Sequence, residues 1–417
     1  AQLTNTGGTI RASGSAAFTL GELINGAGGE ISAAQNLCVR ATTFTNQGLI
    51  DAQNTHLITT TLNHQSGGRI YGDHLAIAAT TLTNAPTAGS TDGNVAPVIA
   101  ARNRLDLGVQ TLNNRDGAKI FSLGDLRIGG ALDANKQASG KAGTINNESA
   151  TLEALGNIDI RTGVLNNKDI QFRTDMELVS KTVLQEWQLL PGLIFSPSDT
   201  RTRYRQDEAY IFECSTLCLH IKPTGDQSDQ FARYNFTRTV MRTRVLQSAP
   251  ARILAGGDLT IQADHRPQND KSQILAGGAL NITGAQIENL GAAMQTITRE
   301  VGTVTAYRRQ TAHGNDRAVM SDAGYAPADV ITEPIATGDE IGAARSLGQQ
   351  RFASSATAAS ADLAASLKRI GNTRSGTLTV APGGLYRVAP NATATYLIET
   401  DPRFTGQRAW LSSDFLL

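Results

Sequence analysis

Regularly recurring aspartates are the residues of this chain whose types and spacing could support catalysis. They occur mostly once per repeat in the first part of the chain, at Asp51, Asp73, Asp106, Asp125 and Asp159. Enzymes that cleave polysaccharides need two carboxylates, or a carboxylate with a basic partner, on one face. Asp125 and the later Asp258 instead follow glycine at the start of an alternating run. We interpret them as acceptors for turn amides, and we predict no catalytic residue.

Cys214 and Cys218, together with His220, form a Cys-x3-Cys-x-His cluster. A zinc site needs a fourth ligand, which the surrounding sequence does not supply. A tight turn across residues 215–217 could let the two cysteines bond, which would imply an oxidising compartment, and two unpaired thiols are the alternative. The Gly-Gly pairs, such as Gly28-Gly29, lack the Lys-Ser/Thr of a phosphate loop and are predicted to be corners. We therefore predict no cofactor and no metal.

Arginines that alternate with aromatic residues between 171 and 249 are the candidate partner-binding residues. Arg203 and Arg205 fall on one face of an alternating run, and Tyr204 falls on the other. Arginine beside aromatic residues is typical of interface centres, although a solvated face with acidic counter-ions is the alternative. The candidate set is Arg201, Arg203, Tyr204, Arg205, Tyr210, Tyr234, Arg238, Arg242 and Arg244.

A repeated motif must position these side chains. It reads apolar-x-Asn, a short Gly-bearing turn and Ile-x-small, as in residues 44–52, Phe-Thr-Asn-Gln-Gly-Leu-Ile-Asp-Ala. It returns with a period near 20 residues, in Leu23–Ile31, Leu62–Ile70, Leu112–Ile120 and, more loosely, Ile145–Leu152. A fixed period of this length predicts a repeat architecture.

A second alternating pattern lies half a period later. Examples are Leu37-x-Val39, Leu75-x-Ile77 and Leu105-x-Leu107, with Phe18-x-Leu20 as an earlier member. Short alternating runs predict half-buried strands, and Gly and Asn between them predict corners, with Asn bonding locally. The predicted fold is all-β: a right-handed parallel β-helix, or solenoid, with an extra-helical β-hairpin excursion and loop insertions.

Changes in this pattern divide the chain. Residues 1–170 are predicted to be β-helix coils, with surface loops at 86–93 and 133–140 where the spacing is too long. Residues 171–249 lose the repeat and gain aromatic residues, which predicts antiparallel hairpins packed on the helix. Coils resume at 250–294; residues 295–374 are an irregular insertion with a possible short helix, and residues 375–417 are closing strands that form a cap.

Composition excludes several classes of protein. The 417 residues carry a formal net charge of +0, whereas a nucleic-acid binder normally carries a basic excess. No apolar run approaches the roughly 18–20 residues that span a bilayer. The chain enters a repeat directly at Ala1, so we expect it to be a segment of a longer protein.

Three stretches resemble the filamentous haemagglutinin family of two-partner-secretion and contact-dependent growth-inhibition exoproteins. They are Leu-Asn-Asn-Arg-Asp-Gly-Ala-Lys-Ile at 112–120, the doubled Ile-Leu-Ala-Gly-Gly at 253–257 and 274–278, and the ending Tyr-Leu-Ile-Glu-Thr-Asp-Pro-Arg-Phe-Thr at 396–405. The resemblance implies an elongated shaft on the bacterial cell surface, secreted through an outer-membrane transporter. Members of the family act in adhesion or carry a toxin at the far C-terminal end.

We therefore expect a non-enzymatic, secreted or surface-displayed shaft segment. It would serve adhesion or the presentation of a growth-inhibition toxin. One alternative is a segment that binds a receptor or glycan on a host or target cell through the arginine and aromatic residues of the excursion. A second alternative is a polysaccharide lyase or hydrolase built on a β-helix.

Overall fold

The computed structural model is nearly all β and has two compact units. It describes residues 1–65, 67–87, 95–190, 202–312 and 315–332, with the backbones of two later strands, β30 (Tyr386–Val388) and β31 (Leu397–Glu399). The first unit includes Ala1–Phe172 and Gln247–Ala292. The second comprises Arg173–Leu246 and Ala293–Thr337.

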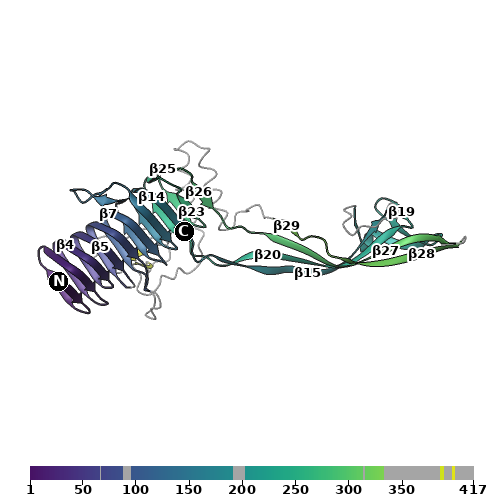
Figure 1. Cartoon of the computed structure of the whole chain (residues 1–417), viewed down its shortest axis with the longest axis horizontal. Helices are drawn as coiled ribbons and strands as arrows, with labels where there is room; N and C mark the ends of the chain where they lie inside the picture. The colour runs from purple at the N-terminus through teal and green to yellow at the C-terminus, as the bar shows by residue number, and fades with distance from the viewer. Residues whose placement is uncertain are drawn as a thin grey trace. The chain divides into compact units, whose positions relative to one another are not determined.

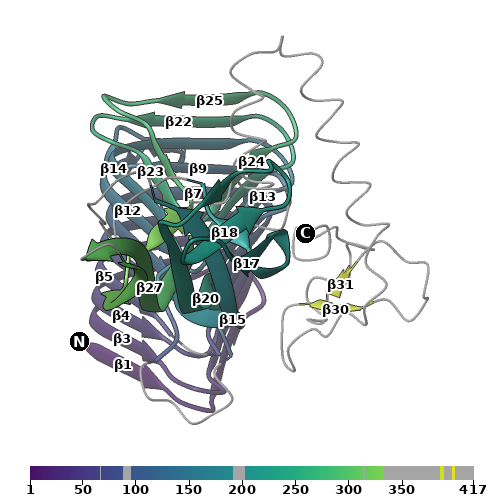
Figure 2. The same cartoon turned by 90° about the vertical axis from the view of Figure 1, so that its right-hand side faces the viewer.

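One large parallel sheet dominates the first unit (Figures 1 and 2). Figure 2 shows β1, β3 and β4 towards one end of this sheet and β22 and β25 at the other. Its strands are β1 (Gln2–Asn5), β2 (Thr9–Ala12), β3 (Ala16–Asn25), β4 (Glu30–Asn46), β5 (Leu49–His64), β6 (Arg69–Asn84), β7 (Val98–Arg115), β8 (Lys119–Ser122), β9 (Asp125–Gly129), β12 (Ala142–Glu148), β13 (Thr151–Ala154), β14 (Ile158–Lys168), β21 (Arg252–Ala255), β22 (Leu259–Ala263), β23 (Gln268–Asp270), β24 (Gln273–Ala276), β25 (Leu280–Thr283) and β26 (Glu288–Leu290).

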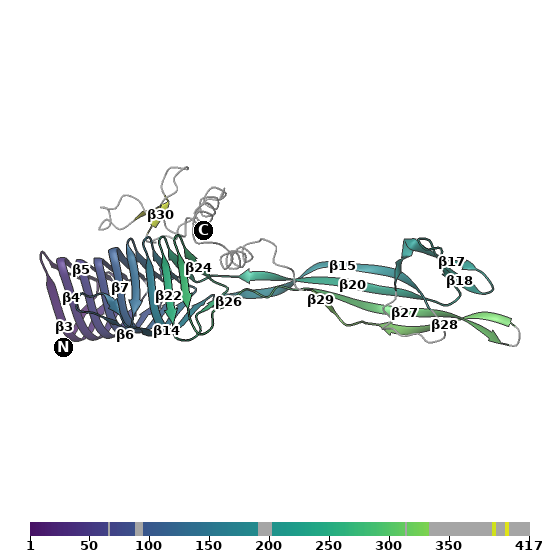
Figure 3. The same ribbon diagram turned by 90° about the horizontal axis from the view of Figure 1, so that it is seen from above.

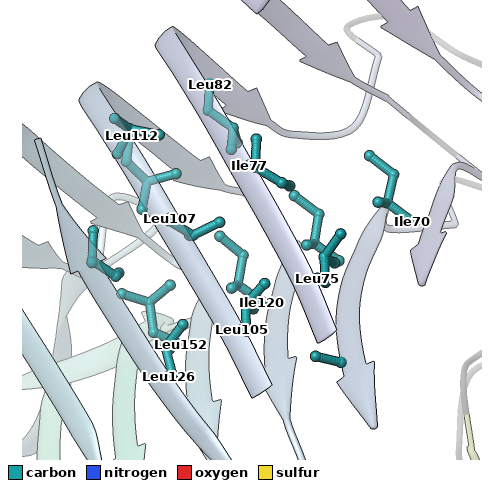
Figure 4. Packing of buried hydrophobic residues seen from close by; sticks show 14 of the residues in the cluster. Ile70, Leu75, Ile77, Leu82, Leu105, Leu107, Leu112, Ile120, Leu126 and Leu152 are labelled. Atoms are coloured by element: carbon teal, nitrogen blue, oxygen red, sulfur yellow. The ribbon is translucent and has the colours of Figure 1, made fainter. Parts of the chain in front are cut away.

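Equivalent residues of successive repeats pair in register, so that aliphatic side chains form columns (Figure 4). Ile31, Ile50 and Ile70 are neighbours in one column, and all three are completely buried. Each buried side chain of this size stabilises the fold by about 1.5–3 kcal/mol. The full column is Ile10, Ile31, Ile50, Ile70, Ile99, Ile120, Leu152, Ile253 and Ile274.

The pairing adds one residue to the isoleucine column that the sequence pattern missed, and it corrects the alignment of an earlier repeat in the second pattern. Ile99 pairs with Ile70 on one side and Ile120 on the other, although the preceding loop hides it from a search by period. Phe18 pairs with Val39, so it belongs to the second position of the Leu37-x-Val39 pattern and not to the first. Ala16 occupies the first position instead, opposite Leu37.

A buried column of asparagines runs beside the aliphatic columns. Wherever two asparagines are neighbours in the column, the amide of one donates to the side-chain oxygen of the next, at 2.7–2.9 Å. The prediction that these asparagines bond locally was therefore incomplete, because their main partners lie one rung away. The column is Asn5, Asn25, Asn46, His64, Asn84, Asn114, Asn147, Asn167, Asn269 and Asn289.

The Gly28-Gly29 pair explains why glycines follow the asparagine. Gly28 has a φ of 71°, a left-handed conformation that other residues rarely adopt. Gly29 has an ordinary φ, but a Cβ on it would collide with the side-chain oxygen of Asn25 and the carbonyl oxygen of Asn5. The two glycines thus form a corner, as predicted, for two different reasons.

Insertions leave the register of the sheet intact. The stretch at 133–140, predicted as a surface loop, contributes to a hairpin of β10 (Ala131–Leu132) and β11 (Ala138–Ser139) that packs against the backbone of Gly108. Most of the other predicted loop, 86–93, lies outside the described residues. Across the longest interruption, Leu152 of β13 still pairs with Ile253 of β21.

The second unit is built from long antiparallel strands (Figure 3). Its larger sheet has the order β16-β15-β20-β27-β28, and β29 also pairs with β27. These strands are β15 (Arg173–Leu189), β16 (Tyr204–Arg205), β20 (Phe231–Gln247), β27 (Thr296–Ala312), β28 (Asn315–Tyr325) and β29 (Val330–Thr332). A small sheet contains β17 (Ala209–Glu213), β18 (Leu217–Ile221) and β19 (Gln227–Ser228), preceded by the 3-10 helix η1 (Gln206–Glu208).

The segment that begins at residue 295 differs from its prediction. Its first part was expected to be irregular, yet β27 and β28 form a regular hairpin, and β27 pairs with β20 over Phe231–Arg242. Thr296–Arg309 lies within the single strand β27, which pairs with β20 on one side and with the adjacent β28 on the other. The possible helix at 353–369 lies outside the described residues. Of 375–417, the structure describes β30 and β31, which pair antiparallel.

His64 interrupts the asparagine column. Its Nδ1 accepts from the Asn46 amide at 3.1 Å, and its Nε2 donates to the Val98 carbonyl at 3.0 Å. A neutral imidazole has one N–H where an amide has two, so nothing is left to donate to the side-chain oxygen of Asn84. That oxygen is buried without a partner in the described structure. Burial lowers the pKa of His64 to about 3.

Replacing His64 by Asn should stabilise the fold and reduce its sensitivity to acid. The unfolded chain binds a proton at His64 near pH 6.5, whereas the folded chain does so only near pH 3. Stability is therefore lost as pH falls through this window, by about 1.4 kcal/mol per pH unit. Between pH 6.5 and pH 5, urea denaturation should show about 2 kcal/mol less loss for His64→Asn than for the native chain.

His265→Asn is the matched control, because His265 is exposed. It should follow the native pH dependence. Identical acid sensitivity of the native chain and His64→Asn would show that the column does not hold a neutral imidazole.

Candidate functional site

The arginine and aromatic residues predicted to bind a partner lie in the second unit, where they divide into three groups. Arg201 lies outside the described residues. Some of the others are internal, some form ion pairs at the surface, and Tyr210 presents an exposed ring. Each group has a different capacity to contact a partner.

Arg203 directly precedes β16, and its half-buried side chain packs on residues of the larger sheet. Its guanidinium lies over the rings of Tyr234, Phe236 and Tyr325, at 5.1–5.8 Å from the ring centres. Its Nη1 also donates to the Tyr325 hydroxyl at 2.7 Å. A cation among three aromatic faces is a common recognition arrangement, but here the chain fills it with its own arginine.

Two glutamates complete this cluster. Glu186 and Glu300 lie 3.3 and 3.6 Å from the Arg203 guanidinium, and Glu300 also accepts from Arg238 at 2.7 Å. The Tyr325 hydroxyl donates to Glu300 at 2.6 Å. Arg203 and Arg238 are thus both neutralised within the sheet.

The protonation states in the cluster follow from these contacts. Burial would raise the pKa of Glu300, but hydrogen bonds from Tyr325 and Arg238 outweigh it and lower the pKa below its ordinary value. Burial and the hydrogen bond to Glu300 raise the pKa of Tyr325 to about 12. At neutral pH the glutamate is ionised and the phenol is protonated, so Glu300 serves as a charged acceptor for Tyr325 and Arg238.

Two of the predicted tyrosines are also structural. Tyr234 is 1% exposed, and its hydroxyl donates to the Gln188 side chain at 2.6 Å. Tyr204 is half-buried and packs against a cluster that contains Trp187 and Phe231. Neither ring is accessible enough to anchor a partner.

The remaining arginines form surface ion pairs. Arg205 pairs with Glu208 at 3.5 Å, and Arg242 and Arg244 share Glu177 at 2.6 and 3.9 Å. All three arginines are more than half exposed. These contacts agree with the alternative of a solvated face with acidic counter-ions, and such exposed pairs contribute about 1 kcal/mol or less.

Tyr210 is the exposed member of an aromatic face on the small sheet, whose other two rings are half-buried. Tyr210 is 47% exposed and lies opposite His220 of β18, with ring centres 5.0 Å apart. The Phe212 ring lies 6.1 Å from Tyr210. We call Tyr210, Phe212 and His220 the aromatic face. A disulfide between Cys214 and Cys218 closes the turn between its two strands.

The opposite side of the same strands is apolar and covered. Ala209, Leu219 and Ile221 are buried with Trp187 in a hydrophobic cluster. Residues of opposite type therefore alternate along β17 and β18, which fixes which side faces solvent. This core and the disulfide hold the aromatic face in place. The face is therefore preorganised, which lowers the entropic cost of binding a ligand.

The aspartates of the parallel sheet are engaged in structure. The Asp125 carboxylate accepts from the amide of Asn157 at 2.9 Å, and the Asp258 carboxylate accepts from the amide of Ala279 at 2.7 Å. The prediction that Asp125 and Asp258 accept from turn amides is confirmed. Asp159, which shares a shallow polar depression with them, pairs with Arg161 at 3.2 Å.

Asp106 is a buried acidic residue of the first unit. Its carboxylate is completely buried and contacts His74, Arg104 and the amide of Ala138, the last at 2.8 Å. Burial would raise the pKa of Asp106, but these three partners lower it. The Ala138 bond ties the β10–β11 hairpin to β7. The His74–Asp106 pair therefore helps to hold the inserted β10–β11 hairpin against the sheet.

The described residues contain no group of three or more His, Cys, Asp or Glu side chains arranged to hold a metal ion. They also contain no helix long and apolar enough to span a bilayer. Comparison with models of known families, with curated proteins and with solved structures gave no match for the chain.

Sequence reasoning missed Glu186, Glu300 and Tyr325, which neutralise and enclose the arginines. One signal was available. Gly302, Val304 and Ala306 alternate as small residues, and such a pattern indicates that large side chains cover one face of the strand. The identity of the covering strand was not available, because β20 ends at Gln247, far before β27 begins at Thr296.

Replacing Arg203 by Ala should destabilise the second unit, because we expect Arg203 to have a structural role. The substitution removes the cation from three rings and two carboxylates, at a cost of about 1–3 kcal/mol. Urea denaturation of the full chain, followed by tryptophan fluorescence, measures this loss. Arg205→Ala is the control and should change stability by less than about 0.5 kcal/mol. Equal stability of the two variants would argue against a structural role for Arg203.

Proposed function

We propose that this chain is a non-enzymatic shaft segment of a filamentous-haemagglutinin-like exoprotein, wound as a right-handed parallel β-helix. The observation that carries the proposal is the unbroken register of the isoleucine and asparagine columns. It holds from Ile10 to Ile274 and from Asn5 to Asn289, across every insertion between them. Identical rungs that stack without limit are what a structure of adjustable length requires.

The mechanism of such a shaft is mechanical. Each rung adds about 4.8 Å, and its backbone bonds to the rung before and the rung after. Bending the stack would stretch many of these bonds at once, and it would also open the close-packed aliphatic columns. The stack therefore transmits position along its length, which suits adhesion or the presentation of a toxin.

Export to the bacterial cell surface is part of the proposal. The Cys214–Cys218 disulfide supports it, because disulfides persist in oxidising compartments. By the resemblance noted above, the transporter would be an outer-membrane protein of two-partner secretion.

The aromatic face supports a second candidate function, contact with a glycan of a host or target cell. Sugar rings stack on exposed aromatic side chains, and Tyr210 is the most exposed ring of the three. This proposal replaces the arginine-centred surface expected from the sequence, since Tyr234 is buried and Arg203 is engaged by Tyr325, Glu186 and Glu300.

A lyase or hydrolase is less well supported. Asp106, Asp125 and Asp258 accept hydrogen bonds from backbone amides, and Asp159 is paired with Arg161. Carboxylates used in this way hold turns and insertions together, and they are poorly placed to act as an acid and base pair.

Deleting one full period, residues 50–69, should leave a folded chain. Ile70 would then follow Leu49 and take the place of Ile50 opposite Ile31, and the other columns would close in the same way. Circular dichroism and cooperative urea unfolding should match those of the native chain, and binding of the purified chain to cells should be retained.

The half-period deletion of residues 50–59 is the control and should unfold, because it places strand residues opposite corners. Equal loss of structure in both deletions would contradict a modular shaft. Turnover of an acidic polysaccharide by the same preparation, lost on Asp159→Ala, would overturn the non-enzymatic proposal.

Tyr210→Ala should weaken binding of the full chain to cells by about tenfold or more, because the central ring of the contact is lost. Binding is measured with labelled chain on intact cells and on cells treated with glycosidases. Met320→Ala, which truncates a side chain that is 62% exposed elsewhere in the unit, should bind as the native chain does. Native affinity of Tyr210→Ala would exclude the aromatic face.

A further inference from the structure

Strand β15 leaves most of one edge of the larger sheet open. β20 pairs along one side of β15, whereas on the other side β16 pairs only with Glu186 and Trp187. From residue 173 to residue 185, no strand in the described part of the chain covers this side. An open edge presents a row of unpaired N–H and C=O groups, which is a template for another strand.

The side chains along this edge are unusually apolar for their exposure. Every residue from 178 to 183 is exposed, on both faces of the sheet. Leu178, Val179 and Val183 are 59%, 52% and 79% exposed. Proteins usually protect such an edge with proline, bulges or several charges, and this stretch carries a single charge, on Lys181.

The charges on β15 favour pairing with another copy of the same strand. Asp175 and Lys181 form no ion pair with any described residue, although the Asp175 carboxylate accepts from the Met176 amide at 2.8 Å. Glu177, in contrast, is already engaged by Arg242 and Arg244. Arg173, Asp175 and Lys181 are therefore the charges left for a partner, and Asp175 and Lys181 are the two that flank Leu178 most closely.

An antiparallel pair of β15 strands centred on Leu178 satisfies both charges. In this register each Asp175 lies directly opposite the Lys181 of the other copy, on the same face, and the two Leu178 side chains meet at the centre. Opposite charges at facing positions stabilise an antiparallel pair, and like charges destabilise it. Thr174 faces Thr182 in the same register, which is a favourable cross-strand pair.

We propose that β15 is a self-association edge, through which two copies of this chain join their larger sheets by antiparallel β15–β15 pairing about Leu178. This interaction is independent of the aromatic face and of the transporter. For a surface shaft it would link neighbouring molecules side by side. It also accounts for apolar side chains that the fold of a single chain leaves in water.

Disulfide trapping tests the register. Facing residues of antiparallel strands have Cα atoms about 4.5–5.5 Å apart, within the range of a disulfide. In a Cys38→Ser background, Leu178→Cys should form a covalent dimer under mild oxidation. Val183→Cys is the control, because its two copies would be about 30 Å apart in this register. Crosslinking of Val183→Cys as fast as Leu178→Cys, or of neither, would overturn the proposal.

Charge reversal tests the pairing without cysteine. Asp175→Lys and Lys181→Asp should each raise the dimer dissociation constant by about tenfold or more, because each places like charges opposite one another. The double variant should restore native association. Sedimentation of the full chain measures this, and circular dichroism confirms folding. A monomeric native chain, or a double variant no better than the single ones, would contradict self-association.

Discussion

The parallel sheet depends on keeping a row of buried amides satisfied. A primary amide has two N–H donors and an oxygen that accepts, and an unpaired buried polar group costs about 1–3 kcal/mol. Asn114 gives one N–H to Asn147 and the other to the Thr151 carbonyl, and it accepts from Asn84. Only another asparagine at the same position of the next rung completes this pattern. A slip of one residue would face every amide outwards and every isoleucine away from its column.

This constraint acts on the rungs and leaves the chain between them free. Asn167 donates to Asn269, 102 residues later, with the same geometry as between adjacent rungs. Closing a longer loop adds little entropic cost, since the cost grows with the logarithm of loop length. The sheet therefore accommodates the β10–β11 hairpin and an entire second unit, provided that the returning strand meets the same column.

The sequence was most informative where partners are related by the period. The isoleucine column and the turn aspartates follow from spacing, because each residue's neighbour is its own equivalent one repeat away. The inter-rung role of Asn25 or Asn114 did not follow, since spacing places an amide at a corner but does not show what it bonds. Arg203 was read as a contact residue because Glu300 and Tyr325 lie about a hundred residues away, and no period links them. The β27–β28 hairpin was missed for a different reason: its strands are adjacent in the sequence, but β28 is exposed over most of its length, so no buried face imposes an alternating pattern on it.

The two units thus satisfy their polar groups in opposite ways, and this bears on where recognition resides. In the sheet, a substitution in the asparagine column disturbs the rungs on both sides, so the column favours uniformity. In the second unit, Arg203 and Glu300 form ion pairs and hydrogen bonds with residues that have no equivalent elsewhere in the chain, and the surrounding surface is free to vary. The contact proposed at Tyr210 lies in this second unit, on a disulfide-closed hairpin whose side chains have no repeated equivalents.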